Sequence, residues 1–172
     1  MSKGRIIVNT GDGKGKTTAA FGTALRAAGH GQRVAIVQFI KGSGNYGEAN
    51  AFEKFPNVEF HRIGSGFTWK TADPSIPMAF AREAWDLARR LALSDEYDLL
   101  VLDELNYAVT EGYISEQEIL DLLAGKPERL SVIITGRNAS AGLIAAADTV
   151  TEMRPIKHAF DERVPAKKGI EY

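Results

Sequence analysis

A glycine-rich run near the start of the chain restricts the folds that this sequence can adopt. The apolar segment 5–9 leads into Thr10-Gly-Asp-Gly-Lys-Gly-Lys-Thr-Thr18, and a helical pattern follows. Glycines let a backbone curl until successive N–H groups point at one anion, and the N-terminus of the next helix adds partial positive charge. A strand, a glycine-rich loop and a helix in this order therefore predict a phosphate-binding loop.

The residues of this loop have distinct expected roles. Lys16 supplies a mobile ammonium for phosphate oxygens, and the hydroxyl of Thr17 suits Mg²⁺. Thr10 stands where the strict pattern has a glycine, so we expect a different loop path, with Gly11 and Gly13 allowing the tight turn. The alternative is a glycine-rich turn that binds nothing. The expected nucleotide-binding residues of the loop are Gly11, Asp12, Gly13, Lys14, Gly15, Lys16, Thr17 and Thr18.

Short apolar runs alternate with helical patterns along the rest of the chain. The expected strands are 5–9, 34–39, 58–63, 99–103, 132–135 and 150–153, and the expected helices are 16–28, 46–54, 76–92, 115–123 and 139–146. Nearly continuous apolar strands are typical of parallel sheets that are covered on both faces. The pattern predicts an α/β fold with a mostly parallel central sheet, helices on both faces and a P-loop NTPase, recombinase-like architecture.

The composition excludes several classes of protein. The 21 basic and 22 acidic residues give a formal net charge of −1, which argues against a nucleic-acid partner. The chain has no cysteine, so disulfides, thiolate metal sites and cysteine nucleophiles are excluded. Its apolar stretches are far shorter than the roughly 20 residues that span a bilayer. We expect a cytoplasmic protein without a membrane partner, with one domain over 1–172 and a C-terminal tail or lid over 155–172.

Carboxylates and an arginine follow two of the expected strands. The segment 99–103 ends in Asp103 and is followed by Glu104. A hard cation prefers oxygen ligands, so Asp103 and Glu104 are candidates to hold Mg²⁺ together with Thr17. Arg137 follows the segment 132–135 and is a candidate for a phosphate or nucleoside contact. The alternatives are solvated acids at a strand end and a surface arginine.

Two further loops carry candidate residues. Gln38 and Lys41 lie near the end of the expected strand 34–39, where ligands of parallel sheets bind. Phe67 and Trp69 are two residues apart in a glycine-flanked loop, so in an extended segment they point to the same side. This pair covers a flat apolar ligand or, as the alternative, fills part of the core.

Several blocks occur in a characteristic order from one end of the chain to the other. They are Asn9–Gly22, Val37–Gly42, Gly66–Trp69, Leu102–Asn106, Thr135–Arg137, Asp148–Met153, Lys157–His158 and Lys168–Glu171. A phosphate loop alone is shared by a very large class of proteins, whereas the ordered set is highly specific. In these blocks the sequence resembles the P-loop type of ATP:corrinoid adenosyltransferase.

The resemblance implies a reaction and its substrates. The 5′-deoxyadenosyl group of ATP is transferred to the Co(I) of a reduced corrinoid, either cobalamin or a precursor, and triphosphate is released. This step belongs to adenosylcobalamin biosynthesis or salvage. The resemblance further implies an electron donor, which we expect to be a flavin protein, and a homodimer.

The resemblance also assigns roles to residues. It implies that residues 11–17 bind the triphosphate, that Thr17 and Glu104 hold Mg²⁺ with Asp103 nearby, and that Arg137 contacts the nucleotide.

It further implies that Phe67 and Trp69 lie against the lower face of the corrin, where they replace the lower ligand of cobalt. With Lys16, these two aromatic residues are the expected catalytic residues.

Two other functions remain open from the residues themselves. One is a P-loop kinase or NTPase acting on another small molecule. The other is a non-catalytic, nucleotide-dependent binding protein. The products separate the three hypotheses, because adenosyl transfer releases triphosphate, a kinase or NTPase releases diphosphate, and a binding protein releases neither.

Overall fold

Six parallel strands form a single sheet in the computed structural model, which describes residues 3–40, 47–64, 73 and 75–171. The order across the sheet is β3-β2-β4-β5-β1-β6, and every neighbouring pair is parallel. The six expected strands are confirmed, with ends that shift by at most one residue. The strands are β1 (Ile6–Thr10), β2 (Val34–Gln38), β3 (Val58–Arg62), β4 (Leu99–Asp103), β5 (Ser131–Thr135) and β6 (Thr149–Glu152).

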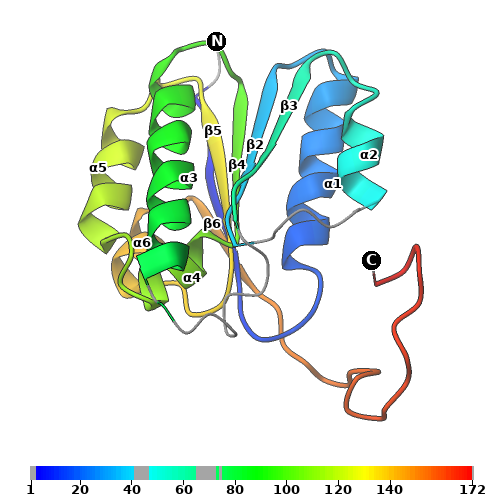
Figure 1. Cartoon of the computed structure of the whole chain (residues 1–172). Coiled ribbons are helices and arrows are strands. Elements are labelled where there is room, and N and C mark those ends of the chain that lie inside the picture. The colour runs from blue at the N-terminus through cyan, green and yellow to red at the C-terminus, as the bar shows by residue number, and fades with distance from the viewer. Residues whose placement is uncertain (1–2, 41–46, 65–72, 74, 172) are drawn as a thin grey trace.

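Helices cover both faces of the sheet, as the sequence predicts (Figure 1). On one face lie α1 (Lys16–Gly29) and α2 (Gly47–Phe52), and their apolar side chains pack on β2, β4 and β5. On the other face lie α3 (Ser75–Leu93), α4 (Leu105–Thr110), α5 (Glu116–Gly125) and α6 (Ala141–Ala146). The strands β2 and β4 are buried along their whole length between these layers.

One helix was not expected from the sequence. The helix α4 begins directly after the acids that end β4, and Glu104 precedes it with a φ of 65°. Its six residues are too few for a helical period to stand out, and the left-handed residue breaks the pattern. A capping box begins α5, since Ser115 Oγ accepts from Glu118 N and the Glu118 carboxylate accepts from Ser115 N.

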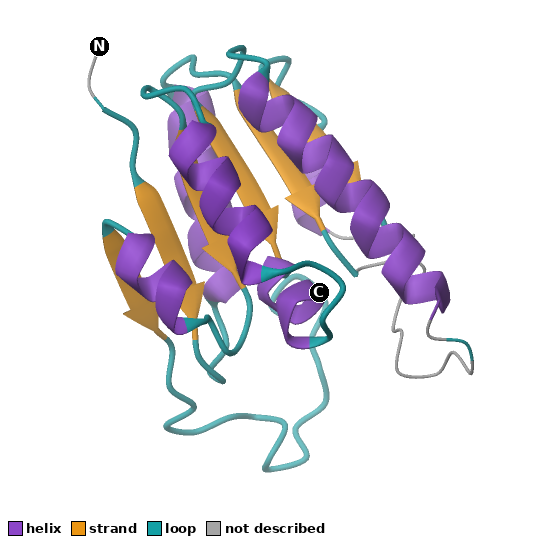
Figure 2. Ribbon diagram, turned by 90° about the vertical axis from the view of Figure 1, so that its left-hand side faces the viewer, coloured by secondary structure: helices purple, strands orange, loops and turns teal. Residues whose placement is uncertain are grey.

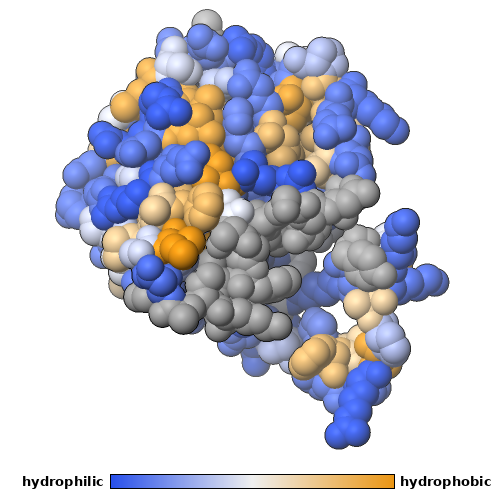
Figure 3. All heavy atoms as spheres, viewed as in Figure 1, coloured by the Kyte–Doolittle hydropathy of each residue, from blue (hydrophilic) through white to orange (hydrophobic). Residues whose placement is uncertain are grey.

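The carboxyl ends of all six strands lie at the same end of the sheet, which we call the carboxyl edge (Figure 2). This edge carries the glycine-rich loop after β1, the acids after β4 and Gly136 with Arg137 after β5. The segment 155–171 lies beyond this edge and contains turns, with no helix or strand among its residues. Figure 3 shows apolar side chains among polar ones on this tail, where Ile156 and Phe160 are largely exposed.

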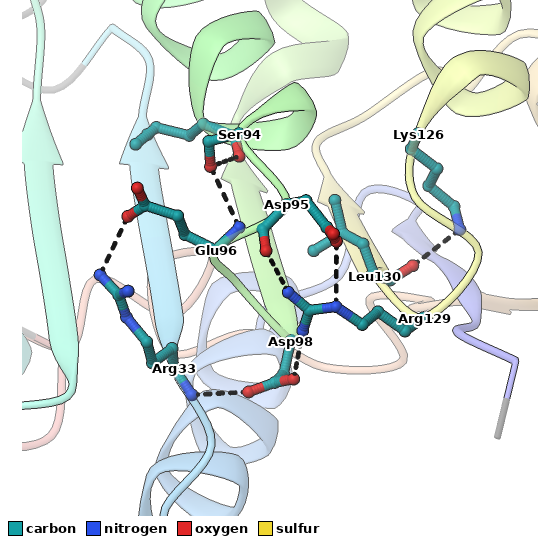
Figure 4. A network of polar contacts seen from close by, with 9 residues as sticks. Arg33, Ser94, Asp95, Glu96, Asp98, Lys126, Arg129 and Leu130 are labelled. Carbon is teal, nitrogen blue, oxygen red and sulfur yellow. Dashed lines mark hydrogen bonds and ion pairs between the residues drawn. The ribbon is translucent and has the colours of Figure 1, made fainter. Parts of the chain in front are cut away.

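Ion pairs hold the opposite edge, where the strands begin (Figure 4). Arg129 Nη1 donates to Asp98 Oδ1 at 2.7 Å, and Arg129 Nε donates to Asp95 Oδ1 at 3.0 Å. The Asp98 carboxylate also accepts from the backbone N–H of Arg33 at 2.9 Å. These contacts tie the loop before β4 to the starts of β2 and β5. In the part of the chain that the structure describes, no helix is long and apolar enough to cross a membrane.

Candidate nucleotide and metal site

The glycine-rich loop is shaped by the end of β6. Gly13 N donates to Met153 O at 2.7 Å, and Met153 N donates to Thr10 O at 2.8 Å. A Cβ atom on Gly11 or Gly13 would come within 2.5 or 2.8 Å of the Met153 carbonyl oxygen. Because these obstacles are backbone atoms, only glycine fits at either position. The departure at Thr10 has a local reason, since its Oγ1 accepts from Ala139 N at 3.1 Å and so anchors the segment before α6.

The loop leaves the first turn of α1 open to a ligand. Gly15 is the N-cap residue with a φ of 111°, and no side chain of the described residues caps the helix there. The N-terminus of α5, by contrast, is closed by the reciprocal bonds of Ser115 and Glu118. The first N–H groups of a helix have no partner within the helix, so those of α1 are available to an anion.

Lys16 lies buried beneath the loop. Its Nζ donates to Gly11 O and Gly13 O, both at 2.7 Å. Burial lowers the pKa of Lys16, whereas the neighbouring Glu104 carboxylate opposes that shift. Phosphate oxygens are charged and form stronger hydrogen bonds than carbonyls, so a triphosphate competes well for this ammonium.

The two acids after β4 have different environments. Asp103 is fully buried, and its oxygens accept from Gln38 Nε2 and Thr135 Oγ1, both at 2.7 Å. Glu104 is half-buried, and its backbone N–H donates to Thr135 Oγ1 at 2.9 Å. Asp103 is therefore oriented by protein donors on both sides, whereas Glu104 extends from the turn that begins α4.

The donor chemistry of this region fits Mg²⁺. The described residues contain no group of three or more histidines or acids that could hold a metal ion by themselves. Mg²⁺ is usually bound through one or two carboxylates together with phosphate oxygens and water. Thr17, Glu104 and Asp103 offer oxygen atoms of this kind, and both acids lie close enough to Lys16 to influence its pKa.

A cavity of about 390 Å³ adjoins the loop on the side of the tail. It has the size of a small-molecule site. An ion pair joins Arg137 Nε and Asp12 Oδ1 at 3.3 Å in its wall. Both side chains are at least half exposed, so the pair contributes only about 0–1 kcal/mol and a polyanion can displace the carboxylate. The cavity is lined by Asp12, Arg137, Pro155, His158, Phe160 and Asp161.

The structure brings most of the expected site residues to this edge. Lys14 Nζ pairs with Glu171 Oε1 of the tail at 3.5 Å, and Thr18 faces a separate apolar groove between α1 and α2. Lys41, Phe67 and Trp69 lie outside the described residues.

Sequence reasoning missed three contributors to the site. Met153 shapes the loop through its backbone, Thr135 bonds both acids, and Tyr107 lies on the unexpected α4. Burial raises the pKa of Tyr107, and the nearby Glu104 carboxylate raises it further. The signal for Tyr107 would have been a short helix after the acids, and the signal for Thr135 its place at a strand end.

Comparisons with known proteins agree over the whole chain. The family model described as ATP:corrinoid adenosyltransferase BtuR/CobO/CobP matches residues 2–172. The corrinoid adenosyltransferase of Escherichia coli (strain K12) is 48% identical over 170 residues, covering 99% of this chain and 86% of the relative. That of Pseudomonas aeruginosa is 45% identical over 171 residues, covering 99% and 84%. Corrinoid adenosyltransferase CobA of Salmonella typhimurium is 47% identical over 170 residues, covering 99% and 86%. This chain therefore belongs to the ATP:corrinoid adenosyltransferase family.

Proposed function

We propose that this protein transfers the 5′-deoxyadenosyl group of ATP to the cobalt of a reduced corrinoid and releases triphosphate. The observation that carries the proposal is the family match over residues 2–172. In the reaction the electron pair of Co(I) forms the Co–C5′ bond, and the C5′–O bond breaks with its pair left on the triphosphate. The chemistry therefore needs an aligned electrophile and support for the leaving group, and it needs no strong general base.

The residues of the carboxyl edge suit these tasks. The open first turn of α1 and the ammonium of Lys16 bind the triphosphate, because they direct positive charge to one point. Thr17 and Glu104 hold Mg²⁺, whose charge offsets the charge that grows on the leaving group. Asp103 is the nearby second acid, and Arg137 binds the nucleotide after the phosphates displace Asp12 from its side chain.

The remaining loop residues complete the nucleotide site. Gly11, Gly13 and Gly15 permit the close approach of phosphate to backbone, and Lys14 and Thr18 flank it. His158 lines the same cavity as Arg137, so an imidazole lies there in addition to the guanidinium.

The corrinoid side of the site rests on the resemblance. Phe67 and Trp69 lie against the lower face of the corrin and displace the lower ligand of cobalt. Loss of the lower ligand favours Co(I), because Co(I) needs no axial ligand. Formation of Co(I) requires an electron, and an electron donor such as a flavin protein supplies it as a partner.

The organisation of the chain completes the proposal. The segment 155–172 serves as a lid on a single domain 1–172, because it carries Phe160 and His158 over the cavity. The protein acts in the cytoplasm as a homodimer, and light scattering at several concentrations tests the dimer.

An anaerobic assay tests the reaction. The protein is mixed with Mg²⁺, ATP and chemically reduced cob(I)alamin, and the corrin absorbance and the phosphate product are followed together. We expect a light-sensitive alkylcobalamin spectrum with one triphosphate per turnover. Persistence of Co(I) while ATP becomes ADP would indicate the kinase or NTPase alternative. Phe67→Ala and Trp69→Ala should slow turnover most when the enzyme starts from Co(II).

A further inference from the structure

Four buried polar side chains form a row across the middle of the sheet. In the register of the strands, Gln38 lies beside Asp103, and Asn9 lies beside Thr135. The register of β4 with β5, continued by one residue, places Asp103 beside Thr135. We call Gln38, Asp103, Thr135 and Asn9 the polar row. Each is at most 7% exposed.

The polar row faces the helix that follows the phosphate loop. Side chains alternate between the faces of a strand, and Ile36, Val101 and Ile133 pack with α1 two residues before the row. Asn9 Nδ2 also reaches the first turn of α1, where it donates to Lys16 O at 3.4 Å. The row therefore forms the floor of the candidate site.

Among the described residues, the two polar atoms of the Gln38 side chain differ in their hydrogen bonding. Its Nε2 donates to Asp103 Oδ2 at 2.7 Å, whereas its Oε1 is buried and accepts no hydrogen bond from the described residues. The reverse orientation of the amide would set an oxygen against the carboxylate, so this orientation is the favourable one. A buried acceptor without a hydrogen bond is unfavourable, and a donor on the ligand would remove that cost.

The ligand donors for this acceptor are few. Triphosphate and carboxylate oxygens only accept hydrogen bonds. Mg²⁺ keeps several of its waters when it binds phosphates, and those waters donate. A ribose hydroxyl is the other O–H donor that ATP brings.

We propose that Gln38 is a positioning residue for the magnesium–triphosphate complex. Its amide N–H orients Asp103, and its Oε1 accepts a hydrogen bond from a water on the ion. The inference rests on the proposed function for the identity of the ligand. It assigns Asp103 to the outer shell of the ion, because both of its oxygens already accept from protein donors.

Equilibrium binding to three probes tests the assignment. Calorimetry measures the affinity of the full chain for ATP with Mg²⁺, for ATP with a chelator, and for inorganic triphosphate with Mg²⁺. Gln38→Met keeps the length of the side chain and removes both polar atoms. We expect it to weaken both magnesium-dependent complexes by about 10–100-fold, as lost outer-shell partners do, and to leave metal-free ATP within about twofold.

A conservative variant separates this role from a structural one. In Gln38→Glu, the introduced carboxyl group contacts Asp103, and the two buried groups share one proton. The shared proton takes the place of the amide N–H toward Asp103. The second oxygen of the introduced group can still accept a hydrogen bond, as Oε1 does in the wild type. We expect this variant to bind the magnesium complexes within about threefold of the wild type, in contrast to Gln38→Met. Thermal unfolding without ligand checks that both variants fold.

Three outcomes overturn the inference. An equal loss for all three probes indicates a structural role, and a loss for ATP alone, with or without Mg²⁺, indicates a ribose contact. Wild-type binding that does not depend on Mg²⁺ also overturns it. Failure of the proposed function looks different, because the wild type would then bind magnesium–ATP normally and form no alkylcobalamin.

Discussion

The two edges of the sheet are built from similar side chains and put them to different uses. Where the strands begin, Arg129 lies between Asp95 and Asp98 and satisfies both, so charges are paired within the protein (Figure 4). Where the strands end, Lys16 Nζ donates to two backbone carbonyls, and the buried Gln38 Oε1 accepts no hydrogen bond from the residues that the structure describes. Completed pairs hold the chain together, whereas incomplete ones favour a ligand that completes them.

The comparison extends to the backbone. Among the described residues, positive φ occurs at both edges: at Gly11, Gly15, Glu104 and Gly136 on the carboxyl edge, and at Gly31 and Asp95 on the opposite edge. A positive φ costs little at glycine, whereas at Glu104 and Asp95 it costs free energy that the surrounding contacts must offset. The two edges therefore differ in their polar groups rather than in their backbone, and substitutions of those groups should separate binding from stability.

Removing the loop ammonium should have the largest effect. We expect Lys16→Ala to lower kcat/KM for ATP by about 10²–10³-fold, because the charge on the departing triphosphate loses its nearest cation. The free energy of unfolding should change by less than about 1.5 kcal/mol. Adenosyl-transfer kinetics and urea denaturation measure the two quantities. Lys54→Ala, at an exposed position after α2, is the control, and equal kinetic losses in the two variants would contradict the assignment.

Filling the space beside β6 should come next. Gly13→Ala places a Cβ atom 2.8 Å from backbone atoms of Met153 and Arg154, which cannot move away cheaply. We expect ATP affinity to fall by about 10–100-fold, since a displaced loop misaligns its N–H groups.

Gly22→Ala is the matched control for this loop variant. It meets nothing within 4 Å in the middle of α1, and it should stabilise the protein by about 0.5–1 kcal/mol. Calorimetry measures the ATP affinity of both variants, and thermal unfolding measures their stability. Unchanged ATP binding in Gly13→Ala would show that the loop does not depend on β6.

At the opposite edge the effect should be confined to stability. Arg129→Ala leaves Asp95 and Asp98 without their cation, and we expect a loss of about 1–3 kcal/mol in the free energy of unfolding. ATP affinity should remain within about twofold of the wild type, because the change lies at the far end of the strands. Arg82→Ala breaks a more exposed pair with Glu118 and should cost less than about 1 kcal/mol. A large loss of ATP affinity in Arg129→Ala would remove the distinction between the edges.

The smallest effect should appear at alkaline pH. Burial and a hydrogen bond to Glu59 raise the pKa of Tyr97, close to Arg33, to about 12. The unfolded chain ionises this phenol first, near pH 10, so its contribution is complete below about pH 10 and is lost as the pH rises toward about 12. Tyr97→Phe should reduce the fall in urea midpoint between about pH 9 and about pH 11. Identical slopes in the two proteins would contradict this assignment.

The sequence predicts the layers of this fold better than the details of its site. Strands were predicted because they are short and nearly continuous apolar runs, and long helices because apolar residues repeat with the helical period. The site residues after β1, β4 and β5 were predicted because ligands bind where parallel strands end. The helix α4 was missed because six residues show too little of a period.

The rest of the site depends on contacts that no local pattern reveals. Thr135 and Asn9 join the polar row through strand register, which is set by the packed sheet. Met153 acts through its carbonyl oxygen, and any side chain at that position would present the same atom. Roles of this kind become visible only when the sheet is assembled.

The bond between Gly13 and Met153 has a consequence for the order in which the protein is made. The loop leaves the ribosome well before β6, the edge strand that shapes it. Contacts so distant along the chain form late, because a long stretch of chain must be ordered first. Nucleotide can therefore stabilise the newborn protein only after β6 has emerged, and a chain that stops before β6 carries the loop sequence without its binding site.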